Sequence, residues 1–287
     1  MNQQQLSFRI GHIGIRVKCE AAACLEAIHA LCALYEPVKT TKPALDFRIF
    51  SDAGKLVLIC SSDSIWKSDD AGEIAAAFEL SLYRKVADSW GTQILSLHAA
   101  AVAACGRAII FSGTSGSGKS SMATKMLLEG LEYLSDEFAL LDNSGRVHPF
   151  PRPLQWGKIR HPAFTHSQML ESGHFRKNSY SFPDHSGKIL TSLLWLPERV
   201  VRKPLPTHAL ILPRFIGRGE KTLLEPIRRS QALMELAPEV HQQFPATDSI
   251  RLLHEYLPDD LPIFRLHYGD VSAAWRALKQ EDLIPSC

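Results

Sequence analysis

The sequence lacks the cysteine patterns of a zinc site or a redox pair. Its cysteines form no C-x-x-C pair and have no histidines at zinc-binding spacing. All of them lie in or beside apolar stretches, which predicts buried thiols in a reducing compartment. They are Cys19, Cys24, Cys32, Cys60, Cys105 and Cys287.

A long apolar run and an excess of one charge are also lacking. No window approaches the ~18 consecutive apolar residues of a membrane-spanning helix, and residues 1–5 do not begin a secretory leader. Lys and Arg number 32 against 30 Asp and Glu, for a net charge of +2. We therefore expect a cytoplasmic protein that binds neither a membrane nor a nucleic acid.

The composition is that of a folded globular chain. Of 287 residues, 45% are hydrophobic and 22% are charged, which allows one large core or two modest ones. Strand patterns on both sides of the turn at Asp52-Ala53-Gly54 predict a small α+β unit. A helix over 71–90 marks its end, so we expect a first domain of residues 1–90 and a second of residues 91–287.

The second domain alternates strands, turns and helices. Apolar runs over 94–104 and 107–111 predict a buried β-hairpin, and a helix should run from Lys119 to Gly130. Strands are expected next over 131–134 and 138–141, followed by a turn at Asp142-Asn143-Ser144-Gly145, a strand over 207–212, helices over 229–236 and 248–256, a strand over 263–266 and a helix over 271–279. This order predicts an α/β core.

Between residues 149 and 188 the periodicity fades. Prolines recur there, and the segment is locally basic through Arg152, Lys158, Arg160, Arg176, Lys177 and Lys188. This pattern is typical of a loop-rich stretch, which is either solvated or a mobile lid over a site.

A glycine-rich turn joins the hairpin to the helix and matches the pattern G-x-x-x-x-G-K-[ST]. In this pattern backbone N–H groups curl around phosphate oxygens, and the following helix directs its positive end at them. Lys119 would neutralise the outer phosphates, and the hydroxyl of Ser120 suits Mg²⁺. A turn that merely links strand to helix does not explain this Lys-Ser pair. We expect the nucleotide-binding residues to be Gly113, Thr114, Ser115, Gly116, Ser117, Gly118, Lys119, Ser120 and Ser121.

Two acidic residues, Asp136 and Glu137, follow the predicted strand over 131–134. One helix and one strand after Lys119 would return the chain beside the glycine-rich turn, with both carboxylates at the end of the strand. Adjacent side chains of an extended backbone point to opposite faces, so one can face an acceptor hydroxyl and the other a metal ion. A solvated acidic turn is the alternative.

Three segments together resemble a known family. They are Ser96-Leu97-His98-Ala99, the turn 113–120, and 133–141 with the sequence YLSDEFALL. They resemble the HPr serine kinase/phosphorylase family, most closely the HPr-kinase-related proteins often called HprK-related kinase A. The resemblance covers about residues 94–160. It implies a P-loop kinase core related to HPr kinase and the carboxykinases, and it suggests an oligomer.

The resemblance also implies roles for individual residues. By motif position, Lys119 contacts the phosphates, Ser120 binds Mg²⁺ and Asp136 accepts a proton. His98 is implied as a supporting active-site residue, although a histidine within an apolar strand is often only a core residue.

Two positions match the family less well. Arg214 aligns loosely with a basic residue near the transferred phosphate, with an exposed strand-end charge as the alternative. Gln155 stands where the family carries a glutamate that binds metal. Because an amide is a poorer ligand than a carboxylate, the second metal contact passes to Glu137.

These observations favour an ATP- and Mg²⁺-dependent kinase that phosphorylates a serine on a small protein or peptide. A kinase of the same chemistry acting on a small metabolite is one alternative, because the phosphate-binding half does not specify the acceptor. A nucleotide-binding regulatory or scaffold protein with little catalysis is the other. Phosphoryl transfer to a candidate acceptor separates the kinases from the scaffold.

Overall fold

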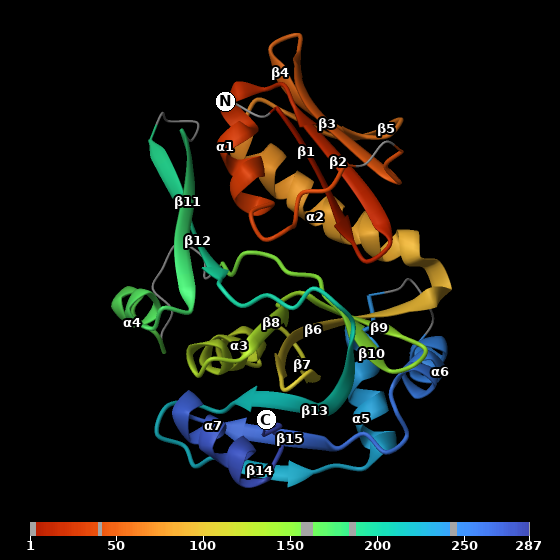
Figure 1. Cartoon of the computed structure of the whole chain (residues 1–287), viewed down its shortest axis with the longest axis vertical. Helices are drawn as coiled ribbons and strands as arrows, with labels where there is room; N and C mark the ends of the chain where they lie inside the picture. Colours follow the sequence, from red (N-terminus) through yellow and green to blue (C-terminus); the bar gives the residue numbers. More distant parts are fainter. Residues whose placement is uncertain (1–3, 40–41, 156–162, 184–187, 242–245, 287) are drawn as a thin grey trace. The chain divides into compact units, whose positions relative to one another are not determined.

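The computed structural model describes residues 4–39, 42–155, 163–183, 188–241 and 246–286. Within them the chain is mixed α/β, with seven α-helices and three β-sheets. It divides into two compact units (Figure 1). The first unit holds residues 1–91 with parts of 152–161 and 175–196, and the second holds the remaining described residues.

A five-stranded sheet forms the body of the first unit. In sheet order its strands are β1 (Gln5–Ile10), β2 (Ile13–Cys19), β3 (Leu45–Asp52), β4 (Lys55–Cys60) and β5 (Asp63–Ser68). The predicted turn at 52–54 joins β3 to β4, and β5 was not predicted because its side chains are mostly exposed. Helix α1 (Ala22–Leu31) packs against the sheet.

Helix α2 (Ala71–Trp90) confirms the predicted helix at the end of this unit. It begins after Asp70, whose carboxylate accepts hydrogen bonds from the N–H groups of Gly72 (2.6 Å) and Glu73 (3.3 Å). It ends at Gly91, which has a φ of 54°. Local chemistry at both ends therefore defines this helix.

The expectation of a loop-rich stretch over 149–188 was wrong in part. The stretch includes α4 (His166–Glu171) and β11 (Phe175–Pro183), which pairs with β12 (Ile189–Pro197) as a two-stranded sheet. These strands are buried over only part of their length, so they lack a full alternation of apolar and polar residues. Trp156, Gly157, Lys158 and Arg160 lie outside the described residues.

An eight-stranded sheet forms the body of the second unit, in the order β10-β9-β6-β7-β13-β15-β14, with β8 paired to β6. The strands are β6 (Ile94–Ala104), β7 (Arg107–Ser112), β8 (Glu132–Ser135), β9 (Phe138–Asp142), β10 (Arg146–His148), β13 (Leu205–Phe215), β14 (Leu223–Pro226) and β15 (Ile263–Tyr268). The helices are α3 (Lys119–Leu128), α5 (Arg229–Leu236), α6 (Ala246–Tyr256) and α7 (Val271–Gln280). The predicted hairpin and the predicted strands and helices of this unit are confirmed within a few residues.

The strand directions bring several strand ends to one edge of this sheet. Strands β7, β13 and β15 are parallel, and Figure 1 shows β13 and β15 side by side. Both β7 and β8 run antiparallel to β6, so β8 is parallel to β7. The carboxyl ends of β7, β8, β13 and β15 therefore meet at the same edge, where α/β sheets bind ligands.

The core of the second unit lies between the sheet and its helices. Helix α3 packs on β6 and β7, α7 packs on β14 and β15, and α3 and α7 contact each other. Strands β6 and β7 are almost wholly buried, which explains their unbroken apolar sequences.

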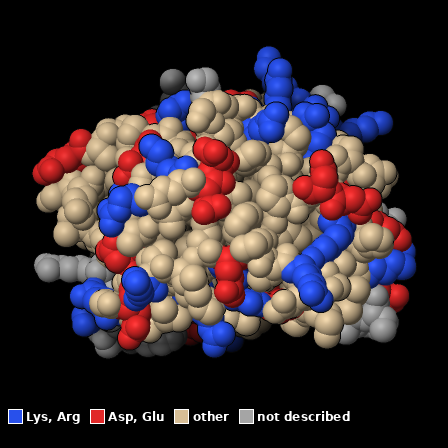
Figure 2. Space-filling view, turned by 90° about the horizontal axis from the view of Figure 1, so that it is seen from below, with Lys and Arg blue, Asp and Glu red and all other residues tan. Residues whose placement is uncertain are grey.

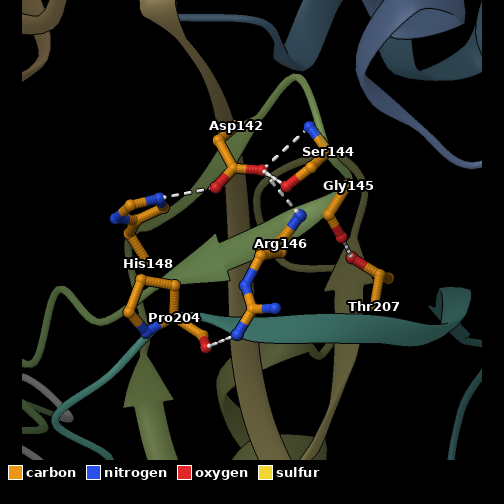
Figure 3. Close-up of polar contacts among 7 residues, drawn as sticks. All are labelled: Asp142, Ser144, Gly145, Arg146, His148, Pro204 and Thr207. Atoms are coloured by element: carbon orange, nitrogen blue, oxygen red, sulfur yellow. Dashed lines mark hydrogen bonds and ion pairs between the residues drawn. The ribbon is translucent and has the colours of Figure 1, made fainter.

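The turn between β9 and β10 is held by the side chain of Asp142 (Figure 3). One carboxylate oxygen accepts hydrogen bonds from the Ser144 N–H (3.0 Å) and hydroxyl (2.6 Å) and from the Arg146 N–H (3.0 Å). The other lies 2.9 Å from Nε2 of His148. Burial tends to raise the pKa of Asp142, but these hydrogen bonds outweigh it and lower the pKa below its ordinary value.

The predicted burial of the cysteines is confirmed for Cys19, Cys24, Cys32 and Cys60. Burial raises the pKa of Cys19 to about 11 and that of Cys24 to about 12. For Cys105 the prediction was wrong, because its side chain is exposed in the tight turn between β6 and β7. Cys287 lies outside the described residues.

Charges of both signs are mixed on the surface. On the face drawn in Figure 2, Lys and Arg are interspersed with Asp and Glu, in keeping with the nearly equal totals of 32 and 30. In the described ranges, no helix combines the length and the hydropathy that a membrane span requires.

Candidate functional site

The glycine-rich turn lies at this edge of the large sheet, between the end of β7 and the start of α3. Three of its residues have a positive φ: Gly113 at 151°, Gly116 at 80° and Gly118 at 102°. Positive φ values among ordinary ones curl the backbone, so that successive N–H groups can face an anion. The strand before the turn and the helix after it are those that the sequence predicted.

Gly118 meets the ring of Tyr268, which lies at the end of β15. A Cβ atom on Gly118 would lie 1.8 Å from the Tyr268 hydroxyl oxygen, so the position requires glycine. The hydroxyl donates to the carbonyl oxygen of Gly118 at 3.3 Å. Burial raises the pKa of Tyr268 to about 12, so it stays a neutral donor near pH 7. The strand end at β15 thereby supports the turn.

Lys119 folds back over the turn. Its ammonium donates to the carbonyl oxygens of Gly113 (2.6 Å) and Thr114 (3.2 Å), and the side chain is largely buried, with the residue 8% exposed. Burial lowers the pKa of Lys119 from its ordinary value. Three carboxylates oppose this shift, in decreasing order Glu239, Asp136 and Glu137. The ammonium is therefore bound to the turn, and the three carboxylates favour its charged form.

Asp136 and Glu137 connect β8 to β9, beside the middle of β6. The Ala99 N–H donates to the Glu137 carbonyl oxygen at 3.1 Å. The chain thus returns to the edge of the glycine-rich turn, as expected. Asp136 is 7% exposed, whereas Glu137 is only half-buried. The two carboxylates therefore have different surroundings, which suits separate roles.

His98 lies on β6, and β6 continues past the end of β7. Ala99, the residue after His98, pairs with Ser112, the last residue of β7. The Ser112 hydroxyl donates to the His98 carbonyl oxygen at 2.9 Å. His98 therefore lies directly beside the start of the glycine-rich turn.

Glu239 is a site residue that the sequence did not reveal. Its carboxylate oxygen lies 2.9 Å from Nδ1 of His98, and its side chain is 10% exposed. Because a carboxylate only accepts hydrogen bonds, Nδ1 carries the proton, and Nε2 is the nitrogen left for a ligand. The His98 side chain is 33% exposed, so a ligand can reach the ring.

The backbone around Glu239 explains this contact. Glu239 ends a short 3-10 turn, Ala237–Glu239, after α5. The next two residues bind the start of β6: Val240 bridges Leu97, and the His241 N–H donates to the Ser96 carbonyl oxygen at 2.8 Å. Glu239 is 141 residues from His98 in the chain, and no local pattern marks it. Only the fold brings the two together.

Arg214 is the penultimate residue of β13 and is exposed. The next N–H, that of Phe215, donates to the Ser117 carbonyl oxygen at 3.0 Å. The strand of Arg214 therefore reaches the glycine-rich turn.

Gln155, by contrast, belongs to the first unit. Its side-chain amide donates to the carboxylate of Glu79 on α2 at 2.9 Å. Its described contacts therefore tie it to α2, whereas both acidic residues of the motif belong to the second unit.

The residues of the edge suit a bound phosphate chain. The Ser117 hydroxyl oxygen is buried and has no hydrogen-bond partner among the described residues, so one polar atom of the turn is left unsatisfied. No group of three or more His, Cys, Asp or Glu side chains in the described ranges could hold a metal alone. Mg²⁺ commonly takes only one or two carboxylates from a protein and completes its shell with phosphate oxygens and water.

Comparison with known proteins identified no relative of this chain. No protein-family model matches the chain, and a search of curated proteins also finds no match.

Proposed function

We propose that the chain is an ATP-dependent kinase of the P-loop type, which transfers the terminal phosphoryl group to a serine hydroxyl on a small protein or peptide. The resemblance of residues 94–160 to the HPr serine kinase/phosphorylase family supports this choice of acceptor. It also underlies the proposed relation of the core to HPr kinase and the carboxykinases.

One observation carries the proposal. The glycine-rich turn, its lysine and the two acidic residues between β8 and β9 lie at the same edge of one sheet. A link between strand and helix alone would need neither the lysine nor the carboxylates. Phosphoryl transfer needs a phosphate cradle, positive charge and a proton acceptor together.

Each group at the edge has a proposed task. The backbone of residues 113–118 and the Ser117 hydroxyl hold phosphate oxygens. When nucleotide binds, the Lys119 ammonium exchanges its two carbonyl partners for the outer phosphates. Ser120 and Glu137 would hold Mg²⁺, which neutralises phosphate charge when bound. Arg214 would add positive charge beside the transferred group.

The attacking serine must lose its proton during transfer. Asp136 is the proposed acceptor of that proton, because a buried carboxylate beside the phosphates can take it as the new O–P bond forms. His98 is proposed to contact the reacting groups through Nε2. Glu239 acts through His98 by holding Nδ1.

The test compares two lysines of the same helix. Lys119→Ala removes the charge on the phosphates, so calorimetry should show Mg²⁺-ATP affinity at least ~10-fold weaker and no transfer. Lys125→Ala removes a lysine that is paired with Glu129 on the next turn of the helix. This variant should leave both the Mg²⁺-ATP affinity and the phosphoryl transfer unchanged. Equal ATP affinity in the wild type and in Lys119→Ala would refute the phosphate site.

Transfer is measured with labelled ATP and candidate serine peptides, against the same peptides with alanine at the acceptor position. Label on the serine form alone supports the kinase. Tight ATP binding without transfer to any peptide or metabolite would instead identify a nucleotide-binding scaffold.

A further inference from the structure

A nucleoside triphosphate has two ends, and the order of the sheet determines where each would lie. The glycine-rich turn follows β7. On one side of β7 lies β6, which carries His98 and pairs with β8 next to Asp136. The transferred phosphate belongs on that side. The nucleoside then extends to the other side, over the ends of β13 and β15.

An exposed aromatic ring lies at this second side. Phe215 ends β13 and is 48% exposed, although residues 209–213 of the same strand are buried. Ile216 beside it is also exposed. Both lie directly at the glycine-rich turn, because the Phe215 N–H donates to the Ser117 carbonyl oxygen at 3.0 Å.

The ring of Phe215 is held in place. Phe215 pairs in register with Tyr268 on parallel β15, so the two side chains lie on the same face of the sheet. Their ring centroids are 5.7 Å apart at an interplanar angle of 66°. The Tyr268 hydroxyl in turn reaches Gly118. The Phe215 ring is therefore supported by Tyr268, while about half of the residue faces solvent.

The backbone after Phe215 is also closely packed. The Ile216 N–H donates to the Tyr268 carbonyl oxygen at 3.0 Å. A Cβ on Gly269 would lie 2.2 Å from the Gly217 carbonyl oxygen, so the two chain segments touch there. A ring on such a backbone needs little ordering when a ligand binds, which favours affinity.

We propose that Phe215 is the stacking platform for the base of the bound nucleotide. This subsite rests on the proposed nucleotide-binding function and names the part of the site that holds the nucleoside. A flat, exposed aromatic ring beside a phosphate cradle provides what a base needs, since stacking uses the π face that every base has.

The test separates the base from the phosphates by comparing Mg²⁺-ATP with inorganic tripolyphosphate in calorimetry on the full chain. Phe215→Ala should weaken ATP binding about 5- to 140-fold, equivalent to ~1–3 kcal/mol of base stacking. Tripolyphosphate, which has no base, should bind the variant as it binds the wild type. Phe215→Trp should restore ATP affinity. Met234→Ala truncates an exposed apolar side chain on α5 and should change the affinity for neither ATP nor tripolyphosphate.

The outcomes are distinct. If the wild type binds tripolyphosphate as tightly as ATP, the base has no subsite and the inference is overturned, while the phosphate site stands. If Phe215→Ala weakens both ligands equally, Phe215 supports the turn and not the base. Failure of the wild type to bind either ligand would overturn this inference and the proposed function together.

Discussion

Replacing Gly118 with alanine should damage the candidate site by two separate mechanisms. Its φ of 102° is a conformation that side chains rarely adopt, which costs about 1–3 kcal/mol. The new Cβ would also lie 1.8 Å from the hydroxyl oxygen of Tyr268. Tyr268 is only 1% exposed, so neighbouring atoms enclose its ring. Overpacking of this kind typically costs a further ~1–3 kcal/mol.

A second glycine provides the matched control. Gly106, in the turn between β6 and β7, has a φ of 72°, and a Cβ atom added to it would meet no other atom within 4 Å. Gly106→Ala therefore carries only the conformational cost. Thermal unfolding should show Gly118→Ala less stable than Gly106→Ala by about 1–3 kcal/mol, a further drop in Tm of roughly 2–12 °C for a domain of 150–250 residues.

Nucleotide binding supplies the second measurement. Gly118→Ala shifts the turn, so Mg²⁺-ATP affinity should fall at least ~10-fold, whereas Gly106→Ala should keep it. Tyr268→Phe removes the oxygen atom and leaves the nearest ring carbon at 2.9 Å, so the double variant should recover part of the lost stability. Equal stability and equal ATP affinity in the two glycine variants would show that the reasoning is wrong.

Three further substitutions test individual side chains. Asp136→Asn keeps the shape of the side chain but not its basicity, so ATP binding should survive while transfer falls by about 10²–10⁴-fold; loss of metal-dependent ATP binding would make Asp136 a metal ligand instead. Glu239→Gln should lower kcat about 10- to 150-fold, the size of a hydrogen bond to a charged group, with little change in ATP affinity, and it should add nothing to His98→Ala; an additive loss would contradict its action through His98. Asp142→Asn should lower the free energy of unfolding at pH 7 by about 1–3 kcal/mol. The pKa of Asp142 is depressed in the folded state, so its contribution is complete above the unfolded value and disappears as pH falls through the folded value. Denaturant unfolding from pH 7 to pH 3 should therefore show the free energies of unfolding of the wild type and Asp142→Asn converging below pH ~4. A difference that stays constant with pH would refute the depressed pKa of Asp142.

Local chemistry explains why much of the fold was predictable from the sequence. The helix over 71–90 carries its own cap at Asp70 and its own stop at Gly91. The turns at Cys105-Gly106 and Asp142–Gly145 contain residues that favour those conformations, and the strands around them are continuous apolar runs. In each case the determining residues lie within a few positions of one another, so no distant contact is needed.

The strands that escaped prediction lack such a local pattern. Strand β5 is mostly exposed, and β11 and β12 are buried along only part of their length. Half-exposed strands are stabilised by the partner they pair with, and the sequence of one strand does not identify that partner. The grouping of 175–196 with the first 91 residues is likewise a matter of contacts between distant segments.

The residues of the candidate site also fall into those that the sequence predicted and those that only the fold revealed. The sequence alone determined the glycine-rich turn, Lys119 and the acidic pair, because spacing within one short segment specifies that turn, the start of its helix and the returning strand. Only the tertiary structure decided that Glu239 holds His98, that Tyr268 lies under Gly118 and that Phe215 borders Ser117. Each of these contacts joins residues more than 90 positions apart, and only the folded chain brings them together.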